Sequence, residues 1–353
     1  MTNKYYDGTK LLSLKDINGN TPAIFMTTSN RSAGKTTYFG RLLIKRFLKD
    51  GKKFGLIYRY KNELDDISGK FFNNIHQLFF PNYQMLEKKK DQGSYVCLYL
   101  REAGEETGVL CGYAFALNSA DNIKKVSHLL SDIDTLYMDE FQSETDNYAP
   151  REIEKLMSIY TSIARGKGEQ ARYIPLYMCS NNVSLLNPYF AEFGISERLR
   201  EDTKFLRGDG WVLECNFNQS ASNVMKLSPF MRAFKNNIYN AFATEQGVYL
   251  NDNTAFIEQL NGRNKYICTL HYNGKNYSVR EYSELGLIYC DTSYDEYYPL
   301  KIAVTLDDHS INYVMLKRNE TLIAYMRYLF EHGCFRFKNL KCKEAIIKCL
   351  SFN

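Results

Sequence analysis

The chain has 353 residues, of which 44% are hydrophobic and 24% charged, and its formal net charge is +5. This composition excludes a disordered chain, and this length predicts two domains rather than one hydrophobic core. The mild positive charge permits a polyanionic partner without requiring one. The nine cysteines include no Cys-x-x-Cys pair, which argues against a zinc site and a disulfide framework and predicts reduced thiols in a cytosol. The sequence has no run of about 18 apolar residues and no signal-peptide pattern, so we expect no membrane segment.

The first predicted elements are a strand, a phosphate loop and a helix. An apolar run leads into Ser29–Thr36, and Gly34-Lys35-Thr36 begins a helix that Asp50-Gly51 ends. In such a loop, backbone N–H groups bind phosphates, the lysine reaches the β- and γ-phosphates, and the hydroxyl holds Mg²⁺. Ser29 replaces the first glycine of the usual pattern, and serine can still adopt the turn that the loop needs, although glycine adopts it more readily. We predict that ATP is bound by Ser29, Asn30, Arg31, Ser32, Ala33, Gly34, Lys35, Thr36 and Thr37.

Two further strands follow, and the second ends in acidic residues. Residues 54–58 predict a strand that completes a β-α-β unit, and residues 135–138 predict a buried strand ending in Asp139-Glu140. An ATPase needs a carboxylate for Mg²⁺ and a general base for the attacking water. We assign these roles to Asp139 and Glu140, with a strand that merely ends in solvated acids as the alternative.

A third strand of this group is predicted over residues 173–179, and it ends in Ser180-Asn181-Asn182. A polar residue at this tip would lie beside the γ-phosphate and respond to its loss. We predict Asn181 as this sensor, with Ser180 and Asn182 as alternatives. A helix cap or turn, which asparagine also favours, explains the same residues equally well.

Basic residues supply a further set of candidates. The helix predicted over residues 150–164 ends in Arg165, on a glycine-rich turn. Arg165 is a candidate arginine finger for a neighbouring subunit's ATP, and a C-capping cation is the alternative. Loops after strands can also follow the phosphates of a nucleic acid, although most such residues are simply solvated. The candidate DNA contacts are Arg59, Lys61, Lys124 and Lys125.

The C-terminal part has a different pattern. Residues 211–217 predict one more strand, and residues 220–243 predict a helical, amphipathic linker. Asn273-Gly274 between two alternating segments, 266–272 and 275–282, predicts a β-hairpin. Further strands are predicted at 287–290, 301–305 and 334–337, with helices over 320–331 and from 341. We therefore predict three parts: an ATPase domain over 1–218, a linker over 219–262 and a small domain over 263–353.

Together, Ser29–Thr36, Arg59-Tyr-Lys61, Tyr137–Phe141 and Met178–Asn182 resemble the genome-packaging ATPases of phi-29-like podophages. These belong to the additional-strand, catalytic-glutamate branch of P-loop ATPases and are related to the large terminases. The resemblance implies an α/β ATPase domain with a mainly parallel sheet flanked by helices, a short helical linker and a small α+β RNase H-like domain.

The same resemblance implies an activity and partners. It implies a homopentameric ring at the portal vertex of a prohead, which uses ATP and Mg²⁺ to pump double-stranded DNA in the cytoplasm of an infected bacterium. Arg165 would act in trans, and Asn181 would couple hydrolysis to motion. Whether a scaffold RNA takes part is left open.

The small domain allows two interpretations. In terminases it is a two-metal nuclease, which requires clustered carboxylates. Here Asp291, Asp307 and Asp308 lie at predicted strand ends, while His271 and Tyr272 stand in the first strand in place of an acid. We favour a vestigial nuclease over an active one. The basic stretch from 336 to 348 could dock an anionic partner or form a solvated helix face. A non-enzymatic, nucleotide-gated scaffold that binds nucleic acid is the remaining alternative.

Overall fold

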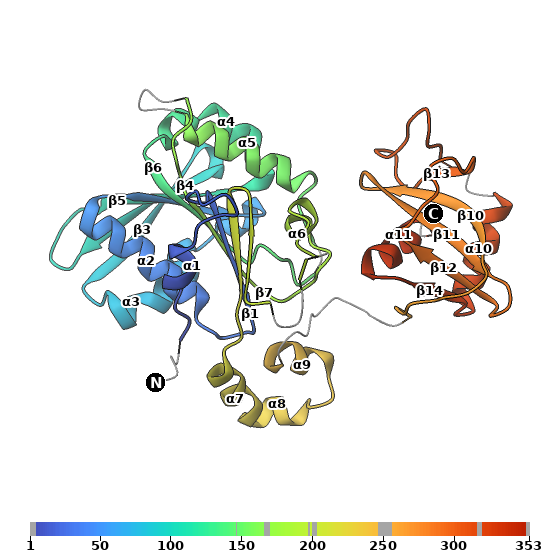
Figure 1. Cartoon of the computed structure of the whole chain (residues 1–353). Helices are drawn as coiled ribbons and strands as arrows, with labels where there is room; N and C mark the ends of the chain where they lie inside the picture. Colours follow the sequence, from blue (N-terminus) through green and yellow to red (C-terminus); the bar gives the residue numbers. More distant parts are fainter. Residues whose placement is uncertain are drawn as a thin grey trace. The chain divides into compact units, whose positions relative to one another are not determined.

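The computed structural model describes residues 5–145, 147–165, 170–196, 198–199, 203–245, 256–315 and 320–350. Contacts divide the chain into two compact units, Met1–Asn251 and Asp252–Asn353 (Figure 1). Within the described ranges, no helix is long and apolar enough to cross a membrane. The division into three parts at residues 218 and 262 remains a prediction.

The first unit is built on one nine-stranded sheet with the order β3-β4-β5-β2-β6-β7-β1-β9-β8. Its strands are β1 (Ile24–Ser29), β2 (Lys53–Tyr58), β3 (Tyr83–Lys90), β4 (Tyr95–Glu102), β5 (Val109–Ala116), β6 (Ile133–Asp139), β7 (Leu176–Asn181), β8 (Phe205–Gly208) and β9 (Trp211–Cys215). The six strands from β5 to β9 in this order run parallel, whereas β4 and β8 are antiparallel to their inner neighbours. The predicted mainly parallel sheet is therefore confirmed.

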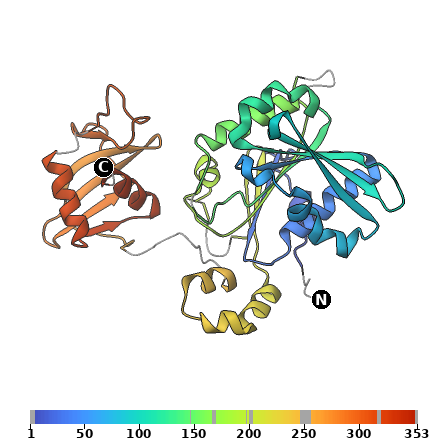
Figure 2. The same ribbon diagram turned by 180° about the vertical axis from the view of Figure 1, so that it is seen from behind.

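Helices cover both faces of this sheet (Figures 1 and 2). One face carries α1 (Thr9–Ser13), α2 (Lys35–Asp50) and α3 (Asn73–Phe79), and the other carries α4 (Ala120–Lys125), α5 (Glu152–Ala164) and α6 (Pro188–Glu192). In β6, Leu136 and Met138 pack on the side of α5, and Tyr137 packs on the side of α2. Burial on both faces explains why the inner strands read as nearly continuous apolar runs.

Glycine sets both ends of α2. Gly34 precedes the helix with φ +93° and Gly51 follows it with φ +67°, both in the left-handed region that only glycine enters at no steric cost. Phe39, Leu43 and Ile44 point into the core from this helix. The helix predicted after the phosphate loop is thereby confirmed, including its stop at Gly51.

The segment after β9 forms three short helices, α7 (Gln219–Leu227), α8 (Pro229–Ala233) and α9 (Ile238–Thr244). The predicted helical character of residues 220–243 is confirmed, but the segment is divided into three helices. The Ser228 side chain accepts a hydrogen bond from the Met231 N–H, and Pro229 occupies the first turn of α8. Asn237 caps α9 in the same way. Two internal helix starts thus divide the segment.

The second unit is a five-stranded mixed sheet with the order β13-β10-β11-β12-β14. Its elements are β10 (Lys265–Tyr272), β11 (Lys275–Tyr282), β12 (Leu287–Asp291), β13 (Lys301–Ala303), α10 (Thr321–Glu331), β14 (Phe335–Phe337) and α11 (Leu340–Leu350). Both helices contribute to one core with the sheet. The predicted hairpin is confirmed, and Asn273 and Gly274 have φ values of +50° and +69°, as a two-residue type I′ turn requires.

Candidate nucleotide-binding site

Three neighbouring strands bring the predicted site residues to one edge of the sheet. β7 lies between β1 and β6, and all three run parallel. Their carboxyl ends therefore place the loop after Ser29, the tip at Asn181 and the tip at Asp139 side by side. A strand between the phosphate-loop strand and the acidic strand is the additional strand that the sequence resemblance implied.

Ser29 does not need the conformational freedom of the glycine it replaces. It is the fully buried last residue of β1, and its hydroxyl donates a hydrogen bond to the Asn30 carbonyl (2.9 Å). The left-handed residues of the loop are Ser32 (φ +59°) and Gly34 (φ +93°). The loop thus turns after Ser29, where serine can be accommodated.

Lys35 lies at the centre of the site. Its ammonium donates to the Ser29 hydroxyl (2.6 Å), the Asn30 carbonyl (3.3 Å) and the Asn181 side-chain carbonyl (3.3 Å). Only 6% of the residue is exposed, and burial lowers its pKa. These contacts connect the phosphate loop to the tip of β7 through a single cation.

Thr36, Asp139 and Glu140 line one cavity of about 270 Å³ beside β2, together with Tyr58 and Lys70. Asp139 accepts hydrogen bonds at Oδ1 from the Cys179 thiol (2.9 Å) and from the Glu140 N–H (3.0 Å). A hydroxyl and a carboxylate are the hard oxygen ligands that suit Mg²⁺, whose remaining ligands are usually phosphate and water. In the described ranges no group of three His, Cys, Asp or Glu side chains could hold a metal alone, so phosphate oxygens would have to complete the site.

Glu140 has the two properties expected of a general base at this position. The residue as a whole is exposed, its carboxylate is partly buried, and it follows directly after the strand end. Burial of the carboxylate and repulsion from Asp139 and Glu144 raise its pKa. A raised pKa makes the carboxylate a stronger base toward water. Its backbone is left-handed, with φ +52°.

Of the three residues at the tip of β7, Asn181 makes the contacts of a sensor. It accepts from Lys35, as described above, and its Nδ2 donates to the Glu144 carboxylate (3.3 Å). Ser180 is buried, donates to the Asn181 carbonyl (2.9 Å) and accepts from the Gln142 N–H (3.3 Å). Asn182 is half-buried at the start of the following loop. The contacts thus favour Asn181 for the sensor role.

The sequence interpretation missed several contacts of the phosphate loop. Arg31 forms an ion pair with Glu144 (3.1 Å) and a hydrogen bond to the Tyr239 hydroxyl on α9. Asn30 exchanges two hydrogen bonds with the backbone of Asn218 (2.8 and 3.1 Å), the residue that caps α7. No local pattern in the sequence relates Arg31 to Tyr239, which lies 208 positions away.

The structure separates the four basic DNA-contact candidates into two groups. Arg59 is 8% exposed and forms an ion pair with Glu152 (2.9 Å), which argues against a contact between its side chain and DNA. Lys61 and Lys125 are exposed, and Lys61 donates to the Gln92 carbonyl (2.8 Å). Lys124 is exposed and pairs with Asp121 (3.4 Å). For these three lysines the DNA contact remains a prediction.

Arg165 directly follows α5 and is exposed, with an extended backbone (φ −76°, ψ 135°). This position is compatible with a finger that reaches another subunit. The glycine-rich turn predicted after it falls on residues 166–169, which lie outside the described residues.

The three predicted nuclease acids of the second unit make separate contacts. Asp291 forms an ion pair with Lys338 (2.8 Å), Asp308 accepts from the Thr305 hydroxyl (2.6 Å), and Asp307 is exposed. His271 stacks on Tyr313, with ring centroids 4.2 Å apart. Lys338 thus pairs with Asp291, and Thr305 donates a hydrogen bond to Asp308, so these acids do not form one cluster. This favours the interpretation of the second unit as a vestigial nuclease.

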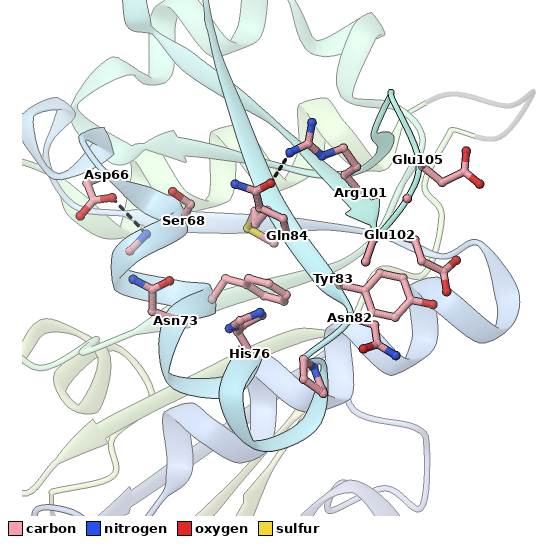
Figure 3. A pocket seen from close by; sticks show the side chains of 16 residues that line it. Asp66, Ser68, Asn73, His76, Asn82, Tyr83, Gln84, Arg101, Glu102 and Glu105 are labelled. Atoms are coloured by element: carbon pink, nitrogen blue, oxygen red, sulfur yellow. Dashed lines mark hydrogen bonds between the residues drawn. The ribbon is translucent and has the colours of Figure 1, made fainter.

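A groove of about 670 Å³ lies elsewhere on the first unit, along β3 and the end of β4 (Figure 3). Asp66 and His76 line the groove on one side, and the Asp66 carboxylate accepts a hydrogen bond from the Gly69 N–H (3.1 Å). Arg101 of β4 donates a hydrogen bond to the Gln84 side chain of β3. Its lining includes none of the predicted ATP-site residues, so it is separate from the nucleotide site.

A phosphate loop, an acidic strand tip and a polar tip on the strand between them define a P-loop nucleotide-binding protein of the additional-strand class. The model of the podovirus DNA encapsidation protein (Gp16) family matches residues 2–350. The chain therefore belongs to this family, and the resemblance inferred from the sequence is confirmed.

Individual relatives agree with the family match. The DNA packaging protein of Bacillus phage B103 is 28% identical over 88% of this chain and 90% of its own length. The DNA packaging protein of Bacillus phage phi29 is 27% identical over 95% of this chain and 93% of its own. A chain of the bacteriophage phi-29 viral genome packaging motor assembly has a TM-score of 0.68 at 24% identity, covering 98% of this chain and all of that one. That likeness shows a shared fold over nearly the whole chain.

Proposed function

We propose that this protein hydrolyses ATP to move double-stranded DNA into a prohead. The observation that carries this proposal is the convergence of Lys35, Thr36, Asp139 and Glu140 at one sheet edge, with Asn181 on the strand between. The family match supports DNA as the cargo.

Each side chain has a defined task in this proposal. Lys35 and the loop N–H groups bind the phosphates, and Thr36 and Asp139 hold Mg²⁺. When bound, the metal neutralises charge that develops on the phosphate oxygens. Glu140 accepts a proton from the attacking water. Asn181, which contacts both Lys35 and Glu144, reports loss of the γ-phosphate to the loop after β6.

The proposed partners follow from the family and from Arg165. We infer a homopentameric ring seated at the portal of the prohead in the cytoplasm of the infected cell. Arg165 of one subunit would reach the ATP of its neighbour and stabilise transition-state charge. The relatives named above are DNA packaging proteins, and one solved relative is part of a viral genome packaging motor assembly.

Lys35→Ala tests the nucleotide site directly. We expect binding of a fluorescent ATP analogue and phosphate release both to be lost, because the buried cation that meets the phosphates is gone. Lys45→Ala, on the exposed face of the same helix, is the matched control and should retain both. Unchanged turnover in Lys35→Ala would show that this edge of the sheet is not the ATPase site.

A further inference from the structure

The turn after β6 holds Glu140 in a conformation that requires support. Its φ of +52° is left-handed, although the residue is not glycine. Such a conformation is unfavourable for a residue with a Cβ and persists only where the surroundings impose it. The groups that hold this turn therefore determine where the Glu140 carboxylate points.

Arg59, the residue that follows β2, donates hydrogen bonds to the backbone of this turn. Its Nη2 donates to the Phe141 carbonyl (2.9 Å), and both Nη atoms lie 3.4 Å from the Glu140 carbonyl. The Nε edge of the same guanidinium faces the Glu152 carboxylate, at 2.9 and 3.1 Å. One planar group thus joins the backbone of the turn to the first residue of α5.

Glu152 is itself fixed in place. Its side chain is 1% exposed and accepts hydrogen bonds from the Tyr189 hydroxyl (2.7 Å) and the Ala149 N–H (2.8 Å). The Tyr148 ring lies 5.0 Å from the Arg59 guanidinium. The pair is therefore buried and hydrogen-bonded throughout, so Arg59 has little freedom to move away from the turn.

A buried ion pair is a poor source of net stability, because desolvation offsets much of the attraction between the charges. The Arg59–Glu152 ion pair instead fixes positions: two backbone carbonyl groups and one carboxylate are held around the planar guanidinium of Arg59. The carbonyls belong to Glu140 and to the residue after it. Displacement of a reacting group by about 1 Å can cost on the order of 10²-fold in rate.

We propose that Arg59, oriented by Glu152, is the positioning residue for the general base Glu140. This inference rests on the proposed function, since it requires Glu140 to activate water. Arg59 acts through the backbone of the turn and does not touch the substrate. The same ion pair fixes the start of α5, the helix that leads to Arg165, so the base and the proposed trans finger share one rigid support.

Arg59→Lys in the full chain is the test. Lysine keeps the charge beside Glu152 but lacks the fork that reaches the carboxylate and the carbonyls together. We expect kcat for ATP hydrolysis to fall by about 10²-fold, while the affinity for a fluorescent ATP analogue stays within about twofold. Arg172→Lys is the matched control, because Arg172 also donates to backbone carbonyls, those of Ser131 and Ile133, and it should retain kcat.

A second comparison separates positioning from stability. In a Glu140→Gln background, Arg59→Lys should cause no further loss of turnover, because two changes that act on one step are not additive. The paired replacement Arg59→Met with Glu152→Leu should fold and bind nucleotide, since an apolar pair can replace a buried ion pair, yet hydrolyse slowly.

The outcomes distinguish this inference from the function on which it rests. Full turnover in Arg59→Lys, or an equal further loss in the Glu140→Gln background, would overturn the positioning role alone. Turnover that Glu140→Gln leaves unchanged would overturn the role of Glu140 as base, and the inference would fall with it.

Discussion

Lys35, Glu144 and Asn181 form the connection that distinguishes this site from a strand tip with ordinary polar residues. Asn181 accepts from Lys35 and donates to Glu144, and Glu144 also pairs with Arg31 of the phosphate loop. A change at the γ-phosphate would therefore affect the phosphate loop, the tip of β7 and the loop after β6 through the side-chain amide of Asn181. Cys179, which lies on β7 with Asn181, donates a hydrogen bond from its buried thiol to the Asp139 carboxylate at the end of β6.

Asn181→Ala tests this connection at the scale of one residue. We expect turnover to fall by roughly 10- to 100-fold, because a hydrogen bond to a charged group contributes about 1.5–3 kcal/mol. Steady-state phosphate release measures the effect. Asn182→Ala is the neighbouring control and should remain near wild type, whereas equal losses in the two variants would remove Asn181 from the sensor role.

Glu214 provides a pH-dependent prediction for stability. It is buried on β9, and it accepts from the Tyr6 hydroxyl (2.6 Å). Burial raises the pKa of the Glu214 carboxyl group. The stability that the protonated form of Glu214 contributes is therefore complete below the ordinary pKa of glutamate. It is lost as pH rises through the raised pKa. Glu214→Gln keeps an acceptor for Tyr6 and removes this loss.

The measurement is the difference in Tm between Glu214→Gln and wild type as a function of pH. We expect the difference to become more positive from acidic to neutral pH. Glu192 is an exposed glutamate of α6, and the control variant Glu192→Gln should show no such trend. A flat difference for Glu214→Gln would contradict the proposed burial cost.

At the scale of elements, the sequence predicted what local patterns determine. The strand, loop and helix around Lys35 and the hairpin at Asn273-Gly274 depend on neighbouring residues, and the structure confirms both. The meander of β3, β4 and β5 was not predicted, because its position in the sheet depends on pairing with β2, which no local pattern encodes. The burial of Arg59 was missed for the same reason, since its partner Glu152 is distant in sequence.

Gly274→Ala tests the hairpin that organises the second unit. Its φ of +69° is unfavourable for alanine by about 1–2 kcal/mol, so we expect the free energy of unfolding to fall by that amount. Faster hydrogen exchange in residues 265–282 of the full chain would report the same loss. Gly274→Asn should lose less, because asparagine tolerates the left-handed region. Equal stability of Gly274→Ala and wild type would contradict the turn type.

At the scale of the whole molecule, the proposed ring divides each ATP site between two copies of the chain. In this proposal Glu140 acts in cis and Arg165 in trans, so Glu140→Gln and Arg165→Ala would damage different sides of one interface. In a mixture of the two variants, roughly a quarter of the interfaces combine an intact base with an intact arginine. We expect each variant alone to retain only a small residual turnover and the mixture to regain a corresponding fraction of wild-type turnover. A mixture as inactive as its components would place Arg165 outside the neighbour's site.

In the proposed function, ATP hydrolysis at this sheet edge is coupled to DNA. Steady-state ATP hydrolysis is compared with and without double-stranded DNA for wild type, Glu140→Gln and Arg165→Ala. We expect DNA to stimulate ATP hydrolysis by the wild type, and we expect both variants to lose this stimulated hydrolysis. Hydrolysis indifferent to DNA, or preserved in either variant, would contradict this proposal.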